Sequence, residues 1–242
     1  MVSKNQIKLI NSLQQKKFRQ VHQLFLAEGV KIIHELIESN FVLEHLFVTE
    51  KLFEEVDEKL KFLITESELK KISCLATPNN CLAVFKMPLQ KPFQNSGLIV
   101  VLDDIRDPGN LGTIIRLCDW FGISQMVCSK NTVDVYNPKV VQATMGSLSR
   151  VSIFYSNLED YLLKSNQVIF GTFMDGQNIY KEKLPNEGIL VFGNEANGIS
   201  KEVEKLIQRK LAIPRFGTLQ QTESLNVATA TAIFLSEFKR LT

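Results

Sequence analysis

Apolar runs alternate with amphipathic segments along the second half of the chain. The first run, residues 97–103, is continuously apolar, which is typical of a strand buried in a parallel sheet. Residues 111–121 follow with apolar positions at helical spacing. Further strands are predicted at 125–129, 151–155, 167–172, 188–192 and 210–213, and further helices at 138–145, 158–164 and after Ser200. This alternation predicts a doubly wound, mostly parallel α/β sheet.

The first 90 residues contain a second, smaller set of alternating segments. Helices are predicted at 5–15, 30–38, 52–59 and 66–72, and strands at 23–27, 43–48, 61–64 and 81–86. Residues 88–97 then combine two prolines, a glycine and polar side chains, a composition typical of a linker. We therefore predict a small α/β domain over residues 1–92 and a larger one over 93–242.

The stretch from Ile213 to Ala232 is predicted to contribute to a ligand-binding site. Ile213-Pro ends a short strand, and Gly217 permits a turn whose backbone stays close to a ligand. Ser224 is a candidate cap for the final helix. The apolar face of this helix comprises Leu225, Ala228, Ala232, Leu235 and Phe238. A capped core helix after a surface loop is the alternative interpretation.

Bulk composition narrows the class of protein. Of 242 residues, 45% are hydrophobic, but no apolar run approaches the roughly 18 residues of a membrane span. We expect a cytoplasmic protein with no membrane partner. The four cysteines form no Cys-x-x-Cys pair, which favours reduced, buried thiols.

Charged and titratable residues are unevenly distributed. The first 20 residues contain no acid and a set of five basic residues, namely Lys4, Lys8, Lys16, Lys17 and Arg19. This basic arm is either a solvated helix face or a nucleic-acid contact. All three histidines lie at or before His45, so the second domain has neither a histidine base nor a His-rich metal site. We expect no metal.

Parallel sheets bind ligands at the carboxyl ends of their strands, so the loops there are the candidates for a site. After residue 103, Asn110 is a candidate helix cap, and Arg116 lies opposite the helix's apolar stripe of Leu111, Ile114, Ile115 and Cys118. Arg116 is either a solvated residue or a fork for a phosphate. After residue 192, Gly193 and Gly198 flank a carboxylate, and such a flexible backbone can hold a polar cofactor. The chain contains neither Gly-x-Gly-x-x-Gly nor a P-loop.

Three stretches, in this order, resemble the motifs of the SpoU (TrmH-like) branch of the SPOUT RNA 2'-O-methyltransferases. They are Asp107-Pro-Gly-Asn-Leu-Gly-Thr-Ile-Ile-Arg116, Leu190-Val-Phe-Gly-Asn-Glu-Ala-Asn-Gly-Ile199, and Ile213-Pro with Glu223-Ser-Leu-Asn-Val227. Residues 1–92 are also similar to the substrate-binding domain of rRNA-modifying members, notably at Phe25-Leu-Ala-Glu-Gly29 and Thr77-Pro78.

The resemblance implies a fold, a cofactor and an assembly. The C-terminal chain is expected to form a deep trefoil knot, and the protein to be a homodimer with its active site near the subunit interface. S-adenosylmethionine is expected to bind in the knot. The cofactor-binding residues implied are Thr172, Gly193, Asn194, Gly198, Ile213 and Leu225. The loop between Gly217 and Ser224 is expected to differ in shape from that of some relatives.

The implied reaction is methyl transfer to a ribose 2'-hydroxyl of RNA. The candidate catalytic residues are Arg116, Asn110, Glu195, Ser224 and Asn226. Relatives have been assigned an arginine base, but a guanidinium stays protonated in proteins. We therefore expect Arg116 to clamp a phosphate and stabilise charge on the 2'-oxygen.

The RNA substrate is a separate question. The resemblance of the first domain favours rRNA, and 23S rRNA in particular. The alternatives are a tRNA-directed enzyme, a non-catalytic RNA-binding factor for ribosome assembly, and a small-molecule-binding domain without an RNA partner.

Overall fold

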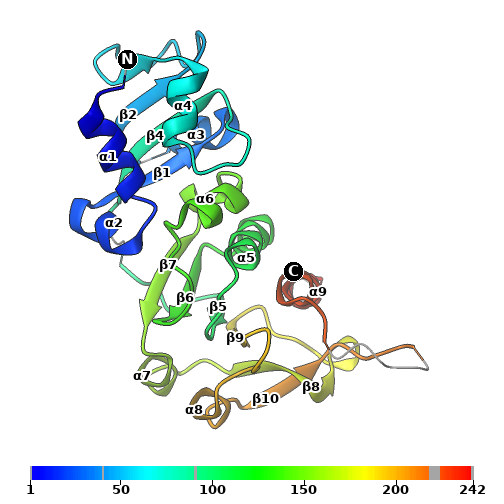
Figure 1. The fold of residues 1–242 in the computed structure, drawn as a ribbon. Helices are drawn as coiled ribbons and strands as arrows, with labels where there is room; N and C mark the ends of the chain where they lie inside the picture. The colour runs from blue at the N-terminus through cyan, green and yellow to red at the C-terminus, as the bar shows by residue number, and fades with distance from the viewer. Residues whose placement is uncertain (1, 40, 90–91, 218–223, 241–242) are drawn as a thin grey trace. The chain divides into compact units, whose positions relative to one another are not determined.

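The computed structural model describes residues 2–39, 41–89, 92–217 and 224–240, and the chain forms two compact units (Figure 1). The first unit comprises residues 1–89 together with 134–149, and the second comprises 90–133 and 150–242. The predicted domain boundary at 92/93 remains a proposal. The predicted Glu223 and the loop from 218 to 223 lie outside the described residues.

The first unit is built on a mixed four-stranded sheet in the order β1-β4-β2-β3. β4 pairs antiparallel with β1 and β2, whereas β2 and β3 are parallel. The strands are β1 (Leu24–Glu28), β2 (Leu43–Val48), β3 (Lys61–Leu63) and β4 (Cys81–Lys86). The helices are α1 (Lys4–Ser12), α2 (Lys16–His22), α3 (Val30–Ile37), α4 (Glu66–Ile72), α6 (Pro138–Thr144) and the 3₁₀ helix η1 (Ser147–Ser149).

Local chemistry explains two of these helices and corrects the prediction of two others. Ser3 opens α1 and Thr65 opens α4, each through a capping box. The helix predicted at 5–15 is wrong in its extent, because the chain turns after Ser12 before α2 begins. The helix predicted at 52–59 is wrong, because Phe53 has a φ of 53° and the segment forms turns instead.

Arg19 is part of the fold of the first unit and does not belong to a solvated basic arm. Its side chain is buried and forms an ion pair with Asp134. Its Nη1 also donates to the carbonyl oxygens of Leu13 and Gln14, at 2.9 Å each. Burying a guanidinium requires this degree of hydrogen bonding. Of the five basic residues predicted to form the arm, Arg19 is therefore excluded as an RNA contact.

The second unit contains a six-stranded sheet in the order β10-β8-β9-β5-β6-β7, and every pairing in it is parallel. The strands are β5 (Leu98–Leu102), β6 (Gln125–Ser129), β7 (Ser152–Ser156), β8 (Ile169–Asn178), β9 (Gly188–Phe192) and β10 (Arg209–Ala212). The helices are α5 (Pro108–Trp120), α7 (Leu158–Leu163), η2 (Ile179–Lys181), α8 (Lys201–Glu204) and α9 (Val227–Lys239). The predicted parallel α/β sheet is confirmed, and the trefoil knot remains a proposal.

The central strands and the helix stripes form the core of this unit. β5 and β9 are buried at every position, as expected for strands covered on both faces. The predicted stripe of α5 is buried as well. All four cysteines are free thiols. Burial raises the pKa of the Cys118 thiol to about 12, so this cysteine stays protonated at neutral pH. Among the described residues, no helix has the length and apolar character needed to cross a membrane.

The two helices next to the predicted site begin at other residues than predicted. Asp107 caps α5, with its Oδ1 accepting from the backbone N–H of Asn110 at 2.8 Å, and Pro108 occupies the first turn. Asn226 caps α9 in place of Ser224. Leu225 therefore precedes the helix and is exposed. The buried face of α9 comprises Val227, Ala228, Thr231, Phe234, Leu235 and Phe238.

Candidate active site

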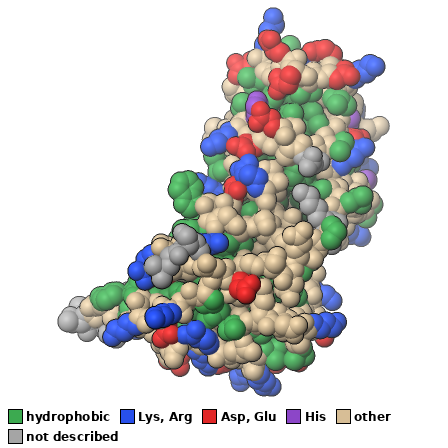
Figure 2. Space-filling model, turned by 180° about the vertical axis from the view of Figure 1, so that it is seen from behind, with side chains coloured by type: hydrophobic (Ala, Val, Ile, Leu, Met, Phe, Trp, Pro, Cys, Tyr) green, Lys and Arg blue, Asp and Glu red, His purple; other side chains and the backbone are tan. Residues whose placement is uncertain are grey.

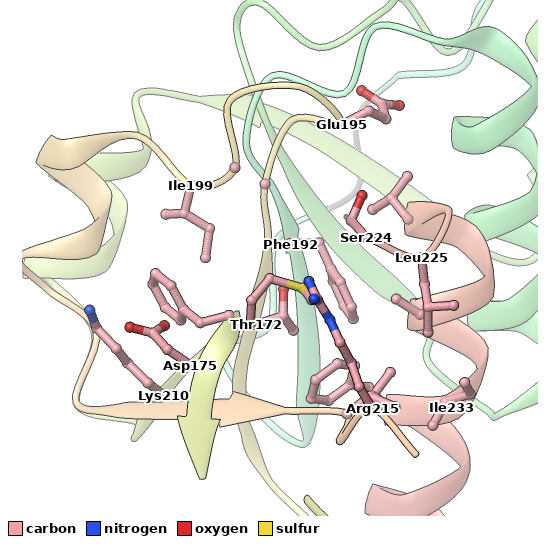
Figure 3. Close-up of a pocket in the computed structure, with 18 of the residues that line it drawn as sticks. Thr172, Asp175, Phe192, Glu195, Ile199, Lys210, Arg215, Ser224, Leu225 and Ile233 are labelled. Carbon is pink, nitrogen blue, oxygen red and sulfur yellow. The ribbon is translucent and has the colours of Figure 1, made fainter. Parts of the chain in front are cut away.

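A pocket of about 1260 Å³ opens in the second unit beside the carboxyl ends of β8, β9 and β10 (Figure 3). This is the edge at which parallel sheets bind ligands. The residues predicted to bind a cofactor all line it, namely Thr172, Gly193, Asn194, Gly198, Ile213 and Leu225. Two of the predicted catalytic residues, Glu195 and Ser224, line it as well.

The loop after β9 forms one wall of the pocket and is held by Asn194. The backbone N–H groups of Asn194 and Gly198 each donate to the other residue's carbonyl, at 2.9 Å. The Asn194 side chain accepts from the backbone N–H groups of Ala196 and Asn197 and donates to the carbonyl of Asp104 at 2.7 Å. One buried amide therefore closes this loop and ties it to the loop after β5.

Gly193 lies where the loop crosses its own backbone. A Cβ at this position would lie 2.1 Å from the carbonyl carbon of Gly198 and 2.2 Å from the nitrogen of Ile199. Gly198 itself has a φ of 67°, which favours glycine. The two glycines that flank the carboxylate in the sequence are thus required by the backbone of the pocket wall.

Three of the predicted catalytic residues form a directed chain of hydrogen bonds. Asn226 Nδ2 donates to Asn110 Oδ1 at 2.9 Å, and Asn110 Nδ2 donates to Glu195 Oε1 at 2.9 Å. The direction is fixed at one end, because Asn226 Oδ1 accepts from the backbone N–H groups of Ala228 and Thr229. A backbone N–H can only donate, so the Asn226 amine faces Asn110. We call this chain the relay.

The pocket joins apolar walls to charged groups of both signs. Phe192, Ile199 and Ile233 line its interior, and Asp175 and Arg215 also reach it (Figure 3). Such a surface suits a ligand that has a flat apolar part and carries both positive and negative groups.

Lys210 contributes a further charge to the lining of the pocket. Its Nζ is 2.5 Å from Glu204 Oε1 and lies 4.4 Å from the centroid of the Phe173 ring. The hydrogen bond that Lys210 donates to Glu204 raises the pKa of the lysine, so Lys210 remains charged at neutral pH.

Arg116 is placed apart from the other candidates. It is exposed on α5 and, like Asn110 and Asn226, it is not among the residues that line the pocket. Within the described part of the chain, no hydrogen bond joins it to Asn110, Glu195 or Asn226. The structure therefore brings Asn110, Glu195 and Asn226 together, with Ser224 nearby on the pocket wall, and leaves Arg116 directed to solvent.

Two acidic residues that support the site were missed by the sequence analysis. Asp107 caps α5, and the buried Asp103 accepts from the backbone N–H of Ser200 at 2.8 Å. The Asp-Pro pair at 107–108 was a signal for the cap, because aspartate is favoured at the cap and proline at the next position. The contact of Asp103 has no signal in the local sequence.

Comparison with protein families covers both units. The model of the SpoU rRNA methylase family matches residues 97–236, and that of the MRM3-like substrate binding domain matches residues 4–83. A 23S rRNA (guanosine(2553)-2'-O)-methyltransferase, RlmP of Bacillus subtilis, is 30% identical over 241 residues, which cover 96% of each chain.

Solved structures agree with these matches. A protein of Porphyromonas gingivalis, assigned to the TrmH family of RNA methyltransferases, is 40% identical with a TM-score of 0.90 and full coverage of both chains. An AdoMet-bound rRNA methyltransferase from Sinorhizobium meliloti is 28% identical with a TM-score of 0.88, covering 100% of this chain and 97% of the other.

The fold, the site and these matches define the class of protein as an rRNA ribose 2'-O-methyltransferase. The chain belongs to the SpoU rRNA methylase family.

Proposed function

We propose that the protein transfers a methyl group from S-adenosylmethionine to the 2'-hydroxyl of a guanosine in 23S rRNA. The observation that carries the proposal is the pocket beside β8, β9 and β10, which is lined by all six predicted cofactor residues and by Glu195 of the relay. The similarity to RlmP over nearly the whole chain supports both the RNA and the base.

The residues of the pocket fit S-adenosylmethionine. Its adenine ring suits the apolar walls at Phe192 and Ile233, and its charged amino-acid end suits the ionic groups at Asp175 and Arg215. The close backbone crossing at Gly193 leaves main-chain groups of the loop next to the ligand. When bound, the cofactor supplies an electrophilic methyl group on a sulfonium.

The relay has a positioning role in this proposal. It holds the loop after β9 at Glu195 against the first turn of α5 at Asn110 and against the cap of α9 at Asn226. The three loops that surround the ligand are thereby fixed to one another. Positioning of well-oriented partners can lower a barrier by on the order of 7 kcal/mol, so rigidity at this point contributes directly to the rate.

Arg116 has a substrate-binding role in this proposal. Its exposed guanidinium is available to a phosphate of the RNA, which it can bind through two parallel N–H groups. The positive charge also stabilises the negative charge that develops on the 2'-oxygen as its proton passes to solvent water. Because a guanidinium does not give up its proton, Arg116 is not the base.

The first unit favours rRNA over tRNA as the substrate. The A. aeolicus tRNA modifying enzyme of the TrmH/SpoU type covers 61% of this chain with a TM-score of 0.51, whereas RlmP matches 96%. The substrate-binding domain model over residues 4–83 accounts for most of the difference. We further propose that the enzyme is cytoplasmic, that its chain is knotted, and that it is a homodimer.

Cofactor binding and substrate preference test this proposal. Calorimetry with S-adenosylmethionine tests the pocket, and labelled methyl transfer to separate pools of unmodified 23S rRNA, 16S rRNA and tRNA tests the substrate. We expect binding, and transfer to 23S rRNA. Transfer to tRNA alone contradicts the assigned substrate, and binding without transfer to any pool favours the non-catalytic assembly factor.

A further inference from the structure

Two exposed aromatic side chains stand at the rim of the pocket. Phe216 follows β10 and is 83% exposed, and Tyr180 lies in η2 and is 41% exposed. Both line the pocket. Their ring centroids are 6.4 Å apart, with 32° between the ring planes. This spacing is near the upper end of the range for ring contact, so neither ring covers the face of the other.

Exposed aromatic rings of this size need an explanation. The interior of the pocket is already walled by side chains such as Phe192 and Phe234, which are almost fully buried. Phe216 is therefore not needed to complete the core. Exposed apolar surface at the rim of a binding site is a candidate contact for a ligand or partner.

Basic residues adjoin the two rings in the sequence, and acidic residues, among them Asp175, line the same pocket. Lys181 and Lys183 follow Tyr180 and are exposed, and Arg215 precedes Phe216. Glu182, between the two lysines, forms an ion pair with Arg209 and so does not neutralise them. Within the described residues, Lys181 and Lys183 form no ion pair. Figure 2 shows blue side chains gathered beside green ones at this end of the second unit.

We propose that Phe216, supported by Tyr180, stacks on an unpaired base of the RNA close to the nucleotide that is methylated. The inference rests on the proposed function and deepens it by assigning a contact for the substrate. Aromatic rings bordered by lysine and arginine are the usual platform for single-stranded RNA. The exposed Lys181 and Lys183, which do not line the pocket, favour RNA as the occupant of the rim, because a polyanion gains from each nearby cation.

The test compares full-length wild-type protein with Phe216→Ala, Phe216→Trp and a matched control, Leu163→Ala. Leu163 is 63% exposed on α7 and does not line the pocket. The probe is a short single-stranded RNA that carries one 2-aminopurine, whose fluorescence is quenched when an aromatic ring stacks on it. KM for 23S rRNA and the affinity for S-adenosylmethionine are measured on the same proteins.

We expect Phe216→Ala to raise the dissociation constant of the probe by about 5- to 150-fold, the effect typical of one lost base–aromatic stack. We expect Phe216→Trp and Leu163→Ala to keep the quenching and the low KM for RNA. We expect all three variants to bind S-adenosylmethionine as tightly as wild type does. Phe216→Ala that binds the probe like wild type overturns the inference. A variant that loses affinity only for S-adenosylmethionine also overturns the inference, because Phe216 would then cover the cofactor and not RNA.

The two proposals fail in different ways. If wild type methylates rRNA and Phe216→Ala matches it in KM and quenching, the stacking contact is wrong and the proposed function stands. If wild type quenches the probe through Phe216 but methylates no rRNA, the stacking contact stands and the proposed function is wrong.

Discussion

Asn226 donates a 2.9 Å hydrogen bond to Asn110, so two residues 116 positions apart in the chain tie the start of α9 to the first turn of α5. Asn226 also caps α9, and Asn110 donates a further hydrogen bond to Glu195. The cap uses the amide oxygen of Asn226, and the relay uses its amide nitrogen. A substitution that changes only one of these atoms can therefore break the relay and keep the cap.

Asn226→Asp is expected to keep the cap and break the relay. A carboxylate still accepts from the N–H groups of Ala228 and Thr229, and its charge suits a helix N-terminus. It offers Asn110 no donor, however, so the Asn110 Oδ1 then faces a carboxylate oxygen with no hydrogen between them. We expect the melting temperature to be close to that of wild type and methyl transfer to fall by about tenfold or more, as for one lost hydrogen bond at a site.

The matched variant Asn226→Ala removes both functions. We expect it to lose about 1 kcal/mol of folding stability through the missing cap, in addition to the loss of activity. Thermal unfolding and methyl-transfer rates of the two variants separate these effects. Full activity in Asn226→Asp contradicts the positioning role of the relay.

Arg116→Ala is expected to reduce methyl transfer by about 100-fold or more, since it removes a group that stabilises developing charge. Cofactor affinity is expected to be unchanged, because Arg116 does not line the pocket. Arg116→Lys keeps the charge but loses the fork, so an intermediate rate is expected. Single-turnover rates with saturating cofactor measure these differences. An active Arg116→Ala enzyme excludes the assigned role.

Gly193→Ala is expected to impair cofactor binding, with Gly217→Ala as its control. The added Cβ at Gly193 would lie 2.1 Å from backbone, whereas a Cβ at Gly217 meets nothing within 4 Å. Displacing the loop costs on the order of 1–3 kcal/mol, so we expect cofactor affinity to fall by about 5- to 150-fold in Gly193→Ala. Calorimetry with S-adenosylmethionine checks this. Equal affinities in the two variants would show that the loop after β9 does not hold the cofactor.

Glu28→Gln is expected to change how stability depends on pH. Burial raises the pKa of Glu28 above 4.5, although Ser73 and the Cys74 backbone donate hydrogen bonds to it. A carboxyl group whose pKa is raised by folding adds stability that is fully present below pH 4.5 and is lost as the pH rises through the pKa of the folded state. Wild type should therefore lose stability relative to Glu28→Gln as the pH rises from 4.5 to neutral. Denaturant unfolding across this range measures it, and parallel curves contradict the expectation.

Strong local patterns predicted most elements of the fold. β2, α4, β4, β6 and β9 begin and end where the sequence analysis placed them, because each has a clear period bounded by turn or capping residues. β8 extends to Asn178, six residues past its predicted end. Its second half is polar and largely exposed, so no hydrophobic pattern marked it.

The sequence analysis predicted most of the residues that form the site, but it did not predict which of them contact each other. Two cap-forming residues lie close together at the start of each helix, Asp107 with Asn110 and Ser224 with Asn226. Local sequence does not decide between them, because the choice depends on how the helix packs. The relay and the ion pair of Arg19 with Asp134 join distant parts of the chain, and such pairs are set only by the tertiary fold.

The most direct test of the central claim is the identity of the nucleoside formed. Wild-type protein is incubated with labelled S-adenosylmethionine and unmodified 23S rRNA, and the digested RNA is analysed by mass spectrometry. The account predicts 2'-O-methylguanosine, formed at least about 100-fold more slowly in a parallel reaction with Arg116→Ala. A guanosine methylated on its base, or no methylated nucleoside despite bound cofactor, contradicts it.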